Sequence, residues 1–406
     1  MDMEQIVDAA FTAWGDTHFT ETGLSRVSHQ LGVTKQALYR RISGKAQLLQ
    51  EMERQFAKDL DAVIDEFEAA ARESSLSQVV ELYVDLVFGF FREHPYYYLY
   101  LTLHLAQFRG NQGAPFREVT VRHRSVLGEI LSRFGFAGSR ENRMAVHFLS
   151  MSGFLWMAGC FWTVDGHRRE AREYPLQIET RRTLAARIIS RGLFPHAPAD
   201  IDFAGVEAVS TVEEHELPER NRILNAIAEV VTEEGFEQAT VEKIAESAGM
   251  SKSSLYYHFR NRTQMVASML VPERDRLLAL VENRVSAYSD FSYRLYAFMV
   301  VTASYASHSR SILTALDWMR FHRIRIYLED EPDYSPVYGF LAEPLEQEGY
   351  LHAGLSEMEV AAYLHHLVMR PVLEEDLGAG ERPAQMLRNI RLLYRMVVGG
   401  LIKEGG

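Results

Sequence analysis

Apolar residues recur at spacings of three and four along most of this chain, which is the period of an amphipathic helix. They are Ile6, Ala9, Ala10 and Ala13 near the start, and Ile223, Ile227, Val230 and Val231 near the middle. No segment alternates between apolar and polar residues in the two-residue period of a half-buried strand. The pattern therefore predicts an all-α fold.

The helical pattern is repeated along the chain. Residues 6–45 align without a gap to residues 223–262, at an offset of 217. Identical residues stand at Ala9/Ala226, Phe19/Phe236, Gly32/Gly249, Lys35/Lys252, Leu38/Leu255 and Tyr39/Tyr256. The ends of the two halves also correspond, residues 191–194 against residues 399–402, at an offset of 208. We interpret the chain as a tandem duplication.

Residues 196–218 separate the two halves. Prolines stand at positions 195, 198 and 218, and an acidic run extends from Glu213 to Glu216. This composition is typical of a linker. A flexible chain of this length has a root-mean-square span of roughly 25 Å, so it could carry the chain along one half to the start of the next.

The second repeated segment has the spacing of a helix-turn-helix. A short helix is predicted from Glu242 to Ala248, after Thr240, whose hydroxyl can accept from a free backbone N–H. Gly249 would end it, because a tight turn between helices often needs a positive φ. Ser251 would cap the next helix, from Lys252 to about Phe259. The apolar residues expected to pack this crossing are Ile244, Ala245, Ala248, Met250 and Leu255.

The first segment keeps the turn glycine as Gly32 and the following cap as Thr34. Its packing residues are Val27, Leu31, Val33 and Leu38, with Ser28 in place of the small Ala245. It departs from the second segment at Gly23, Arg41 and Ile42, which stand in place of Thr240, His258 and Phe259. These differences leave open whether the two segments work equally well.

Composition bounds the class of protein. A chain of 406 residues is too long for one ordinary core, and 47% hydrophobic with 24% charged residues is typical of a soluble globular protein. The single cysteine, Cys160, excludes a disulfide framework and fits a reducing compartment. The acidic start, Met1 to Glu4, leads directly into an amphipathic segment, so we expect no secretory signal and a cytoplasmic protein.

Residues 145–164 carry no Asp, Glu, Lys or Arg, and about 20 apolar residues can span a bilayer. The segment also holds His147, Ser150, Ser152, Cys160 and Thr163, whose polar groups are unfavourable in lipid. We therefore interpret it as a helix buried within the protein and expect no membrane contact.

The charge is distributed unevenly. A net charge of −12 argues against binding nucleic acid by bulk electrostatics. The window 26–45, however, is +5 with no acidic residue, from Arg26, Lys35, Arg40, Arg41 and Lys45. The window 243–262 is +3, from Lys243, Lys252, Arg260 and Arg262 against Glu246. Such local charge can neutralise phosphates and gives binding a steep salt dependence.

The segment from Thr240 through Gly249, Ser251 and Tyr256 to Phe259, followed by Asn261 and Arg262, resembles the DNA-binding domain of the TetR (tetracycline repressor-like) family. The resemblance covers about 45 residues per half. It implies helix-turn-helix domains at residues 1–46 and 219–263. It also implies helical regulatory bodies at residues 47–195 and 264–406, joined by the acidic linker 196–218.

By position, the resemblance implies which residues contact a double-stranded DNA operator. Phosphate contacts would come from Tyr39, Lys45, Tyr256 and Arg262, and the first head would face the major groove with Thr34, Lys35, Gln36 and Arg40. The second head would use Thr240, Ser251, Lys252, Ser253, Tyr257 and His258. Gln pairs bidentately with adenine, and Arg or Lys pairs with guanine. Because the two heads differ, we predict an operator with two unlike half-sites.

The bodies of the family that this chain resembles bind a small-molecule effector and pair as a four-helix bundle. The segments in the pairing position are residues 145–164, 178–194, 360–372 and 384–402. A fused chain can supply both halves of such a bundle, so we expect a monomeric chain that acts as a pseudo-dimer.

Aromatic clusters with polar tips could line an effector pocket for a hydrophobic or aromatic molecule. The candidates are Tyr97, Tyr100, His104, Trp156, Trp318, Phe321 and His322. Aromatic residues at helical spacing are also typical of ordinary core, and both interpretations stay open here.

The leading hypothesis is a ligand-responsive DNA-binding transcriptional regulator, of the repressor kind. The alternative is a small-molecule-binding or interaction scaffold in which one or both DNA-binding heads are vestigial. The sequence holds no GxSxG, P-loop, HExxH or Cys/His metal spacing, so we expect neither an enzyme nor a metal or cofactor.

Overall fold

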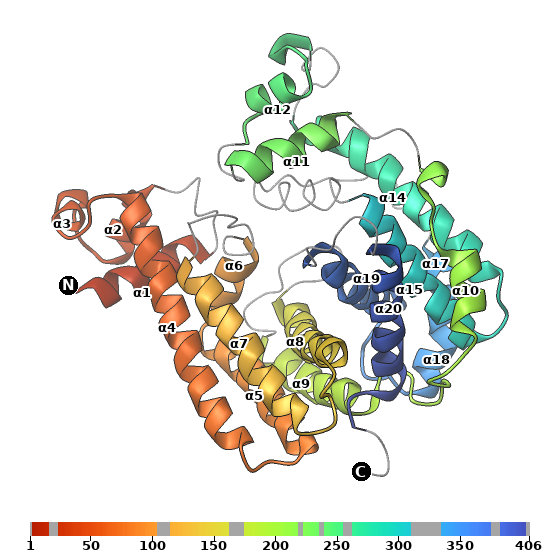
Figure 1. Ribbon diagram of the computed structural model, residues 1–406. Helices are drawn as coiled ribbons and strands as arrows, with labels where there is room; N and C mark the ends of the chain where they lie inside the picture. Colours follow the sequence, from red (N-terminus) through yellow and green to blue (C-terminus); the bar gives the residue numbers. More distant parts are fainter. Residues whose placement is uncertain are drawn as a thin grey trace.

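The computed structural model describes residues 2–15, 23–103, 114–161, 174–217, 222–234, 239–254, 262–309, 334–374 and 382–402. Every regular element in these ranges is a helix (Figure 1), which confirms the all-α fold.

The first half begins with a three-helix head and continues into a helical body. The head consists of α1 (Met3–Gly15), α2 (Leu24–Gln30) and α3 (Lys35–Tyr39). The body consists of α4 (Lys45–Ala71), α5 (Leu76–Glu93), α6 (Pro95–Leu103), α7 (Ala114–Ser132), α8 (Ser139–Phe161) and α9 (Tyr174–Arg191). The long α4 leads directly out of the head, so any tilt of α4 moves the head.

The second half has a similar order of helices. Its head contains α11 (Arg222–Glu234) and α12 (Val241–Ser247), and α14 (Arg262–Ser286) is the long helix that follows. The body continues with α15 (Phe291–His308), α17 (Ser335–Tyr338), a 3-10 turn (Gly339–Leu341), α18 (Ala342–Gln347), α19 (Glu357–Glu374) and α20 (Arg382–Gly399).

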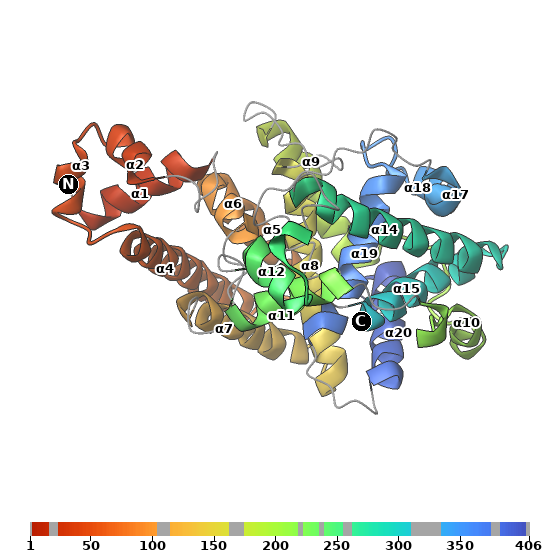
Figure 2. The same ribbon diagram turned by 90° about the horizontal axis from the view of Figure 1, so that it is seen from above.

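Four helices, two from each half, pack together at the centre of the molecule. They are α8 and α9 from the first half and α19 and α20 from the second (Figure 1). In both views α1–α3 lie at one end of the molecule, and α10 (Phe203–Ser210), α17 and α18 lie at the other (Figure 2). The buried hydrophobic residues of both bodies form one continuous core.

The two chain segments that leave α9 and α20 cross each other with reciprocal backbone hydrogen bonds. Leu193 N–H donates to the Val397 carbonyl at 2.6 Å, and Leu401 N–H donates to the Ile189 carbonyl at 2.9 Å. The two donors, Leu193 and Leu401, are 208 positions apart, and so are the two acceptors, Ile189 and Val397. This is the offset at which the ends of the two halves correspond. The contact is therefore the same when the two segments are exchanged.

Glycine makes this crossing possible. Gly192 has φ +87° and Gly400 has φ +67°, the left-handed region that favours glycine. A Cβ on Gly192 would lie 2.3 Å from the Val398 carbonyl oxygen, and one on Gly400 would lie 2.3 Å from that of Ser190. These glycines also end α9 and α20 before residues 194 and 402, where the helices were predicted to end.

The uncharged segment 145–164 lies in α8 as far as Phe161, and residues 162–164 lie outside the described part. α8 packs against α5, α7, α9, α19 and α20, and Phe148, Leu149 and Met157 are fully buried. Among the described residues, no helix combines the length and the apolarity needed to cross a membrane. The interpretation of this segment as a buried protein helix is confirmed.

The segment between the halves differs from the flexible chain that its composition predicts. It contains α10 and a 3-10 turn (Glu214–Glu216), and Phe203, Val206 and Val212 are buried against the second body. Asp202 caps α10 by accepting from the Gly205 N–H at 3.0 Å. The prolines and acidic residues indicated irregular backbone, but apolar side chains spaced between them anchor the segment.

Candidate nucleic-acid interface

The turn between the two short head helices has the same hydrogen bonds in both halves. In the first, the N–H groups of Leu31, Gly32 and Val33 donate to the carbonyls of Val27, His29 and Ser28, at 2.9–3.0 Å. In the second, those of Ala248, Gly249 and Met250 donate to Ile244, Glu246 and Ala245, at 2.8–2.9 Å. Every residue is displaced by 217 positions. Gly32 and Gly249 have φ of +66° and +63°, as the sequence predicts for a tight turn.

The caps also follow the predicted pattern. Thr34 accepts from the Ala37 N–H at 3.2 Å, and Ser251 accepts from the Ser254 N–H at 2.9 Å. Thr240 caps α12 by accepting from the Lys243 N–H at 3.4 Å, whereas Gly23, at the start of α2, supplies no side chain. Helix α2 therefore lacks one stabilising hydrogen bond that α12 has.

The side chains predicted to read DNA lie on the surface of the first head. Thr34, Lys35, Gln36, Tyr39 and Arg40 are all exposed. Tyr39 is 53% exposed, which is unusual for a large aromatic residue. Lys45 begins α4 and is half-buried. An exposed tyrosine beside lysine and arginine is a surface suited to phosphate and base contacts.

The second head presents a smaller described surface. Ser251, Lys252 and Ser253 are exposed, and Thr240 is half-buried. Tyr256, Tyr257 and His258 lie outside the described residues, and Arg262 is described only as the first residue of α14.

Two contacts in the second head are not predicted by the sequence pattern. Lys252 forms an ion pair with Glu242 of α12, ten positions earlier. Arg222 of α11 lies against the turn, because a Cβ on Gly249 would meet its Nη2 at 2.4 Å. Gln5 stands at the position of Arg222 in the first half, so the unequal charge could have been read from the alignment. The pairing of Lys252 required the structure.

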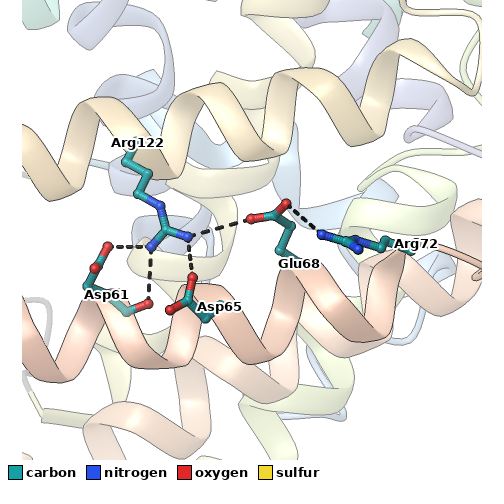
Figure 3. A network of polar contacts seen from close by, with 5 residues as sticks. All are labelled: Asp61, Asp65, Glu68, Arg72 and Arg122. Atoms are coloured by element: carbon teal, nitrogen blue, oxygen red, sulfur yellow. Dashed lines mark hydrogen bonds and ion pairs between the residues drawn. The ribbon is translucent and has the colours of Figure 1, made fainter.

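Helix α4, which carries the first head, packs against α7, and one arginine of α7 forms several ion pairs with it. Arg122 of α7 forms ion pairs with Asp61, Asp65 and Glu68, which lie along one face of α4 (Figure 3). Its Nη1 also donates to the Asp61 carbonyl at 3.3 Å. The carboxylates of Asp61 and Asp65 raise the pKa of Arg122. Spacings of four and three place the three acids on one helix face, so the sequence held this signal.

Two of the predicted pocket residues join the first head to its body. The ring of Phe11, in α1, lies 4.6 Å from that of Tyr97 and 5.2 Å from that of Tyr100, both in α6. Phe56 of α4 packs against both tyrosines. The Tyr97 hydroxyl donates to Asp59 at 2.5 Å, and burial, followed by this carboxylate, raises the pKa of Tyr97. A shift of α6 would therefore reach both α1 and α4.

Trp156, also a predicted pocket residue, lies between the halves. Its ring is 4.9 Å from that of Tyr363 in α19, whose hydroxyl is 2.8 Å from the Ser152 Oγ. The other pocket candidates, His104, Trp318, Phe321 and His322, lie outside the described residues. Within the described ranges, no group of His, Cys, Asp and Glu side chains is arranged to hold a metal ion.

Comparison with known proteins agrees with this geometry. The model of the family described as "Bacterial regulatory proteins, tetR family" matches residues 223–269, the second head and the start of α14. The chain is 22% identical to the transcriptional regulator UidR of Escherichia coli over 192 residues, which cover 46% of this chain and 93% of UidR.

Two further relatives match over shorter regions. The transcriptional activator FasR of Mycolicibacterium smegmatis is 29% identical over 89 residues, covering 22% of this chain and 41% of FasR. The transcriptional repressor KstR2 of Rhodococcus jostii is 35% identical over 94 residues, covering 22% of this chain and 45% of that protein. With the helix-turn-helix geometry and the all-α bodies, these matches identify residues 223–269 as a DNA-binding domain of the TetR family and show that the chain is similar to helix-turn-helix transcriptional regulators.

Proposed function

We propose that this chain is a single-chain pseudo-dimer that regulates transcription by binding an operator with two unlike half-sites. The observation that carries the proposal is the reciprocal crossing of residues 189–193 and 397–401, in which each half makes the backbone contact that the other makes. An exchange of this kind is the signature of a two-fold interface between like partners. Here both partners belong to one chain.

The match to UidR supports the same proposal. Less than half of this chain covers nearly all of that regulator, so the chain has room for two such units. Side chains join the central helices as well: Arg181 of α9 pairs with Glu359 of α19, and His147 Nε2 lies 2.9 Å from the Leu367 carbonyl. Because both halves belong to one chain, their association is intramolecular and does not depend on the concentration of the protein.

The proposed operator is asymmetric because the two reading surfaces differ. The first head offers Gln36 and Arg40, whereas the second offers Ser251 and Ser253 beside a Lys252 that is paired with Glu242. A mismatch at one base pair costs roughly 1–3 kcal/mol, so unlike side chains are enough to select unlike half-sites.

We further propose that the chain is a cytoplasmic repressor, which a small hydrophobic or aromatic molecule in one or both bodies releases from DNA. The packing of Phe11 against Tyr97 and Tyr100 supports the route from body to head, because a ligand that moves α6 must move α1. A coupling of about 1–3 kcal/mol would suffice for induction.

Selection of bound sequences from a random DNA pool tests the proposal. We expect two different half-site motifs at a fixed spacing, bound by one chain of 46.5 kDa in light scattering. A perfect palindrome, or a stable dimer of chains, would contradict the pseudo-dimer. Affinity no tighter than for bulk DNA at two salt concentrations would favour the scaffold with vestigial heads.

A further inference from the structure

The connector, residues 196–217, touches three helices of the second half. Towards α20, Arg395 donates to Asp200 at 2.7 Å and the Tyr394 hydroxyl donates to the Pro198 carbonyl at 2.9 Å. Towards α15, the Val212 N–H donates to the Ser304 Oγ at 3.0 Å.

The third contact is with α14. Glu216 forms an ion pair with Arg284, near the end of the helix that starts at the second head. The pKa of Glu216 is lowered, first by the backbone N–H of Glu213 that donates to it and then by Arg284. The connector thus ends against the C-terminal end of α14, the long helix that begins at the second head.

A buried carboxylate lies at the centre of the connector. Glu207 of α10 is 7% exposed, and it accepts from the Tyr296 hydroxyl of α15 and from Nε and Nη2 of Arg391 of α20. A carboxylate of this kind stays buried only when several donors satisfy it, so the three side chains form one unit. That unit joins α10 to both α15 and α20.

An aromatic contact reinforces this unit. Phe203 of α10 packs edge-on against Tyr296 at 4.8 Å and Tyr394 at 5.6 Å, with Arg395 over its ring at 5.3 Å. Phe203 is 8% exposed. The connector therefore has an apolar anchor and a buried charged anchor that share Tyr296, and a separate salt bridge to α14 at its end.

We propose that the connector is a brace that sets the position of the second head relative to the central bundle, with Glu207 and Phe203 as positioning residues. This inference rests on the proposed function, because it assumes that the two heads must meet DNA at a defined separation. Helix α20 belongs to the bundle, and α14 carries the head; the connector contacts both and holds α15 between them.

The first test measures the heads directly and needs no DNA. Spin labels are attached to the full chain at His29→Cys and Glu246→Cys, two exposed residues at equivalent places in α2 and α12. Cys160 is buried and is kept. Pulsed dipolar spectroscopy should give one narrow distance for the parent chain. In Glu207→Ala and Phe203→Ala the narrow peak should be lost, because the connector that contacts α14 through Glu216 loses its anchors on α15 and α20.

Arg182→Ala is the matched control. Arg182 joins α9 to α5 in the first half, through Asp85 at 2.7 Å, on the face that corresponds to the brace. This variant should keep the narrow peak. Should Glu207→Ala fail to fold, Glu207→Gln keeps an acceptor for Tyr296 and weakens only the bond to Arg391. A narrow peak unchanged in folded Glu207→Gln and Phe203→Ala, despite lower thermal stability, would overturn the brace.

The second test uses the operator recovered by selection. Changing the spacer by one base pair moves one half-site by about 3.4 Å and rotates it around the DNA axis. The parent chain should lose about tenfold in affinity, the order expected when DNA must deform to fit. The Phe203→Ala variant should lose less affinity for the altered operator than the parent chain does. Absence of any specific operator would refute the proposed function, whereas the distance measurement would still decide the brace.

Discussion

Helices α5 and α15 occupy the same place in the two halves, and they are buried differently. Each has 18 residues and starts at a side-chain cap, Ser75 or Asp290. α5 is amphipathic, with Glu81 and Asp85 each 55% exposed on its outer side. α15 is buried on nearly every side, including Tyr296, which stands at the position of Glu81.

The difference shows that the two halves present unlike outer faces. The outer face of α5 and α9 carries solvated ion pairs such as Arg182 with Asp85, which contribute little to stability. The corresponding face of α15 and α20 is apolar around Glu207 and Arg391, and the connector covers it. The central seam, which is the reciprocal crossing of residues 189–193 and 397–401, thus joins two unlike halves. The outer face of the first half is exposed, and the connector covers that of the second.

The largest effect is expected at the braced face. Phe203→Ala removes a buried ring from between Tyr296 and Tyr394 and should lower the free energy of unfolding by about 3–4 kcal/mol. Arg182→Ala, on the free face, should lower it by about 0.5 kcal/mol or less. Urea unfolding of both variants measures the contrast. Equal losses would show that the two faces contribute alike.

The seam should respond symmetrically. Alanine at Gly192 or Gly400 meets both a positive φ and a backbone carbonyl at 2.3 Å, so each should destabilise the chain by at least about 2 kcal/mol. Gly135 is a control with φ +90° and no neighbour within 4 Å of a Cβ, so Gly135→Ala should lose about 1 kcal/mol. Thermal unfolding decides; a loss at only one of the seam glycines would argue against the two-fold relation.

A fall in pH should lower the stability of the second body through His365. Its Nδ1 lies 3.2 Å from the Thr302 Oγ1 and its Nε2 lies 3.0 Å from the Tyr338 hydroxyl. Burial, followed by the charge of His366, lowers the pKa of His365 to about 3. Between pH 6.5 and about 3 the unfolded chain binds a proton that the folded chain does not, so stability falls as the pH falls.

The His365→Gln variant should abolish this contribution, which amounts to about 1–2 kcal/mol between pH 7 and pH 5. Urea unfolding at both pH values gives the difference for the parent chain and the variant. An identical pH dependence in parent and variant would assign the acid sensitivity elsewhere.

The smallest predicted effect is a difference in how much the two heads contribute to operator binding. Lys35 is exposed, so Lys35→Ala should weaken operator binding by about 1 kcal/mol. Lys252 is paired with Glu242, so Lys252→Ala should cost less, and Glu242→Gln should tighten binding by releasing the lysine. Fluorescence anisotropy with the selected operator measures all three. Greater loss at Lys252 than at Lys35 would reverse the proposed ranking of the heads.

The sequence by itself determined the local features of this protein. Helical periodicity predicted the all-α fold, and the spacing around Gly32 and Gly249 predicted both turns with their caps at Thr34 and Ser251. These features follow from interactions between residues a few positions apart. The repeat and the basic windows needed only a comparison of the chain with itself.

The tertiary structure decided what distant residues do to one another. Proline and acidic composition predicted a flexible linker, but the stability of that segment comes from Tyr296, Arg391 and Tyr394, which lie about 90 to 200 positions away. Local composition describes the backbone preference of a segment and not the surface that it meets. The same holds for Lys252 and Glu242, whose pairing depends on how two short helices cross.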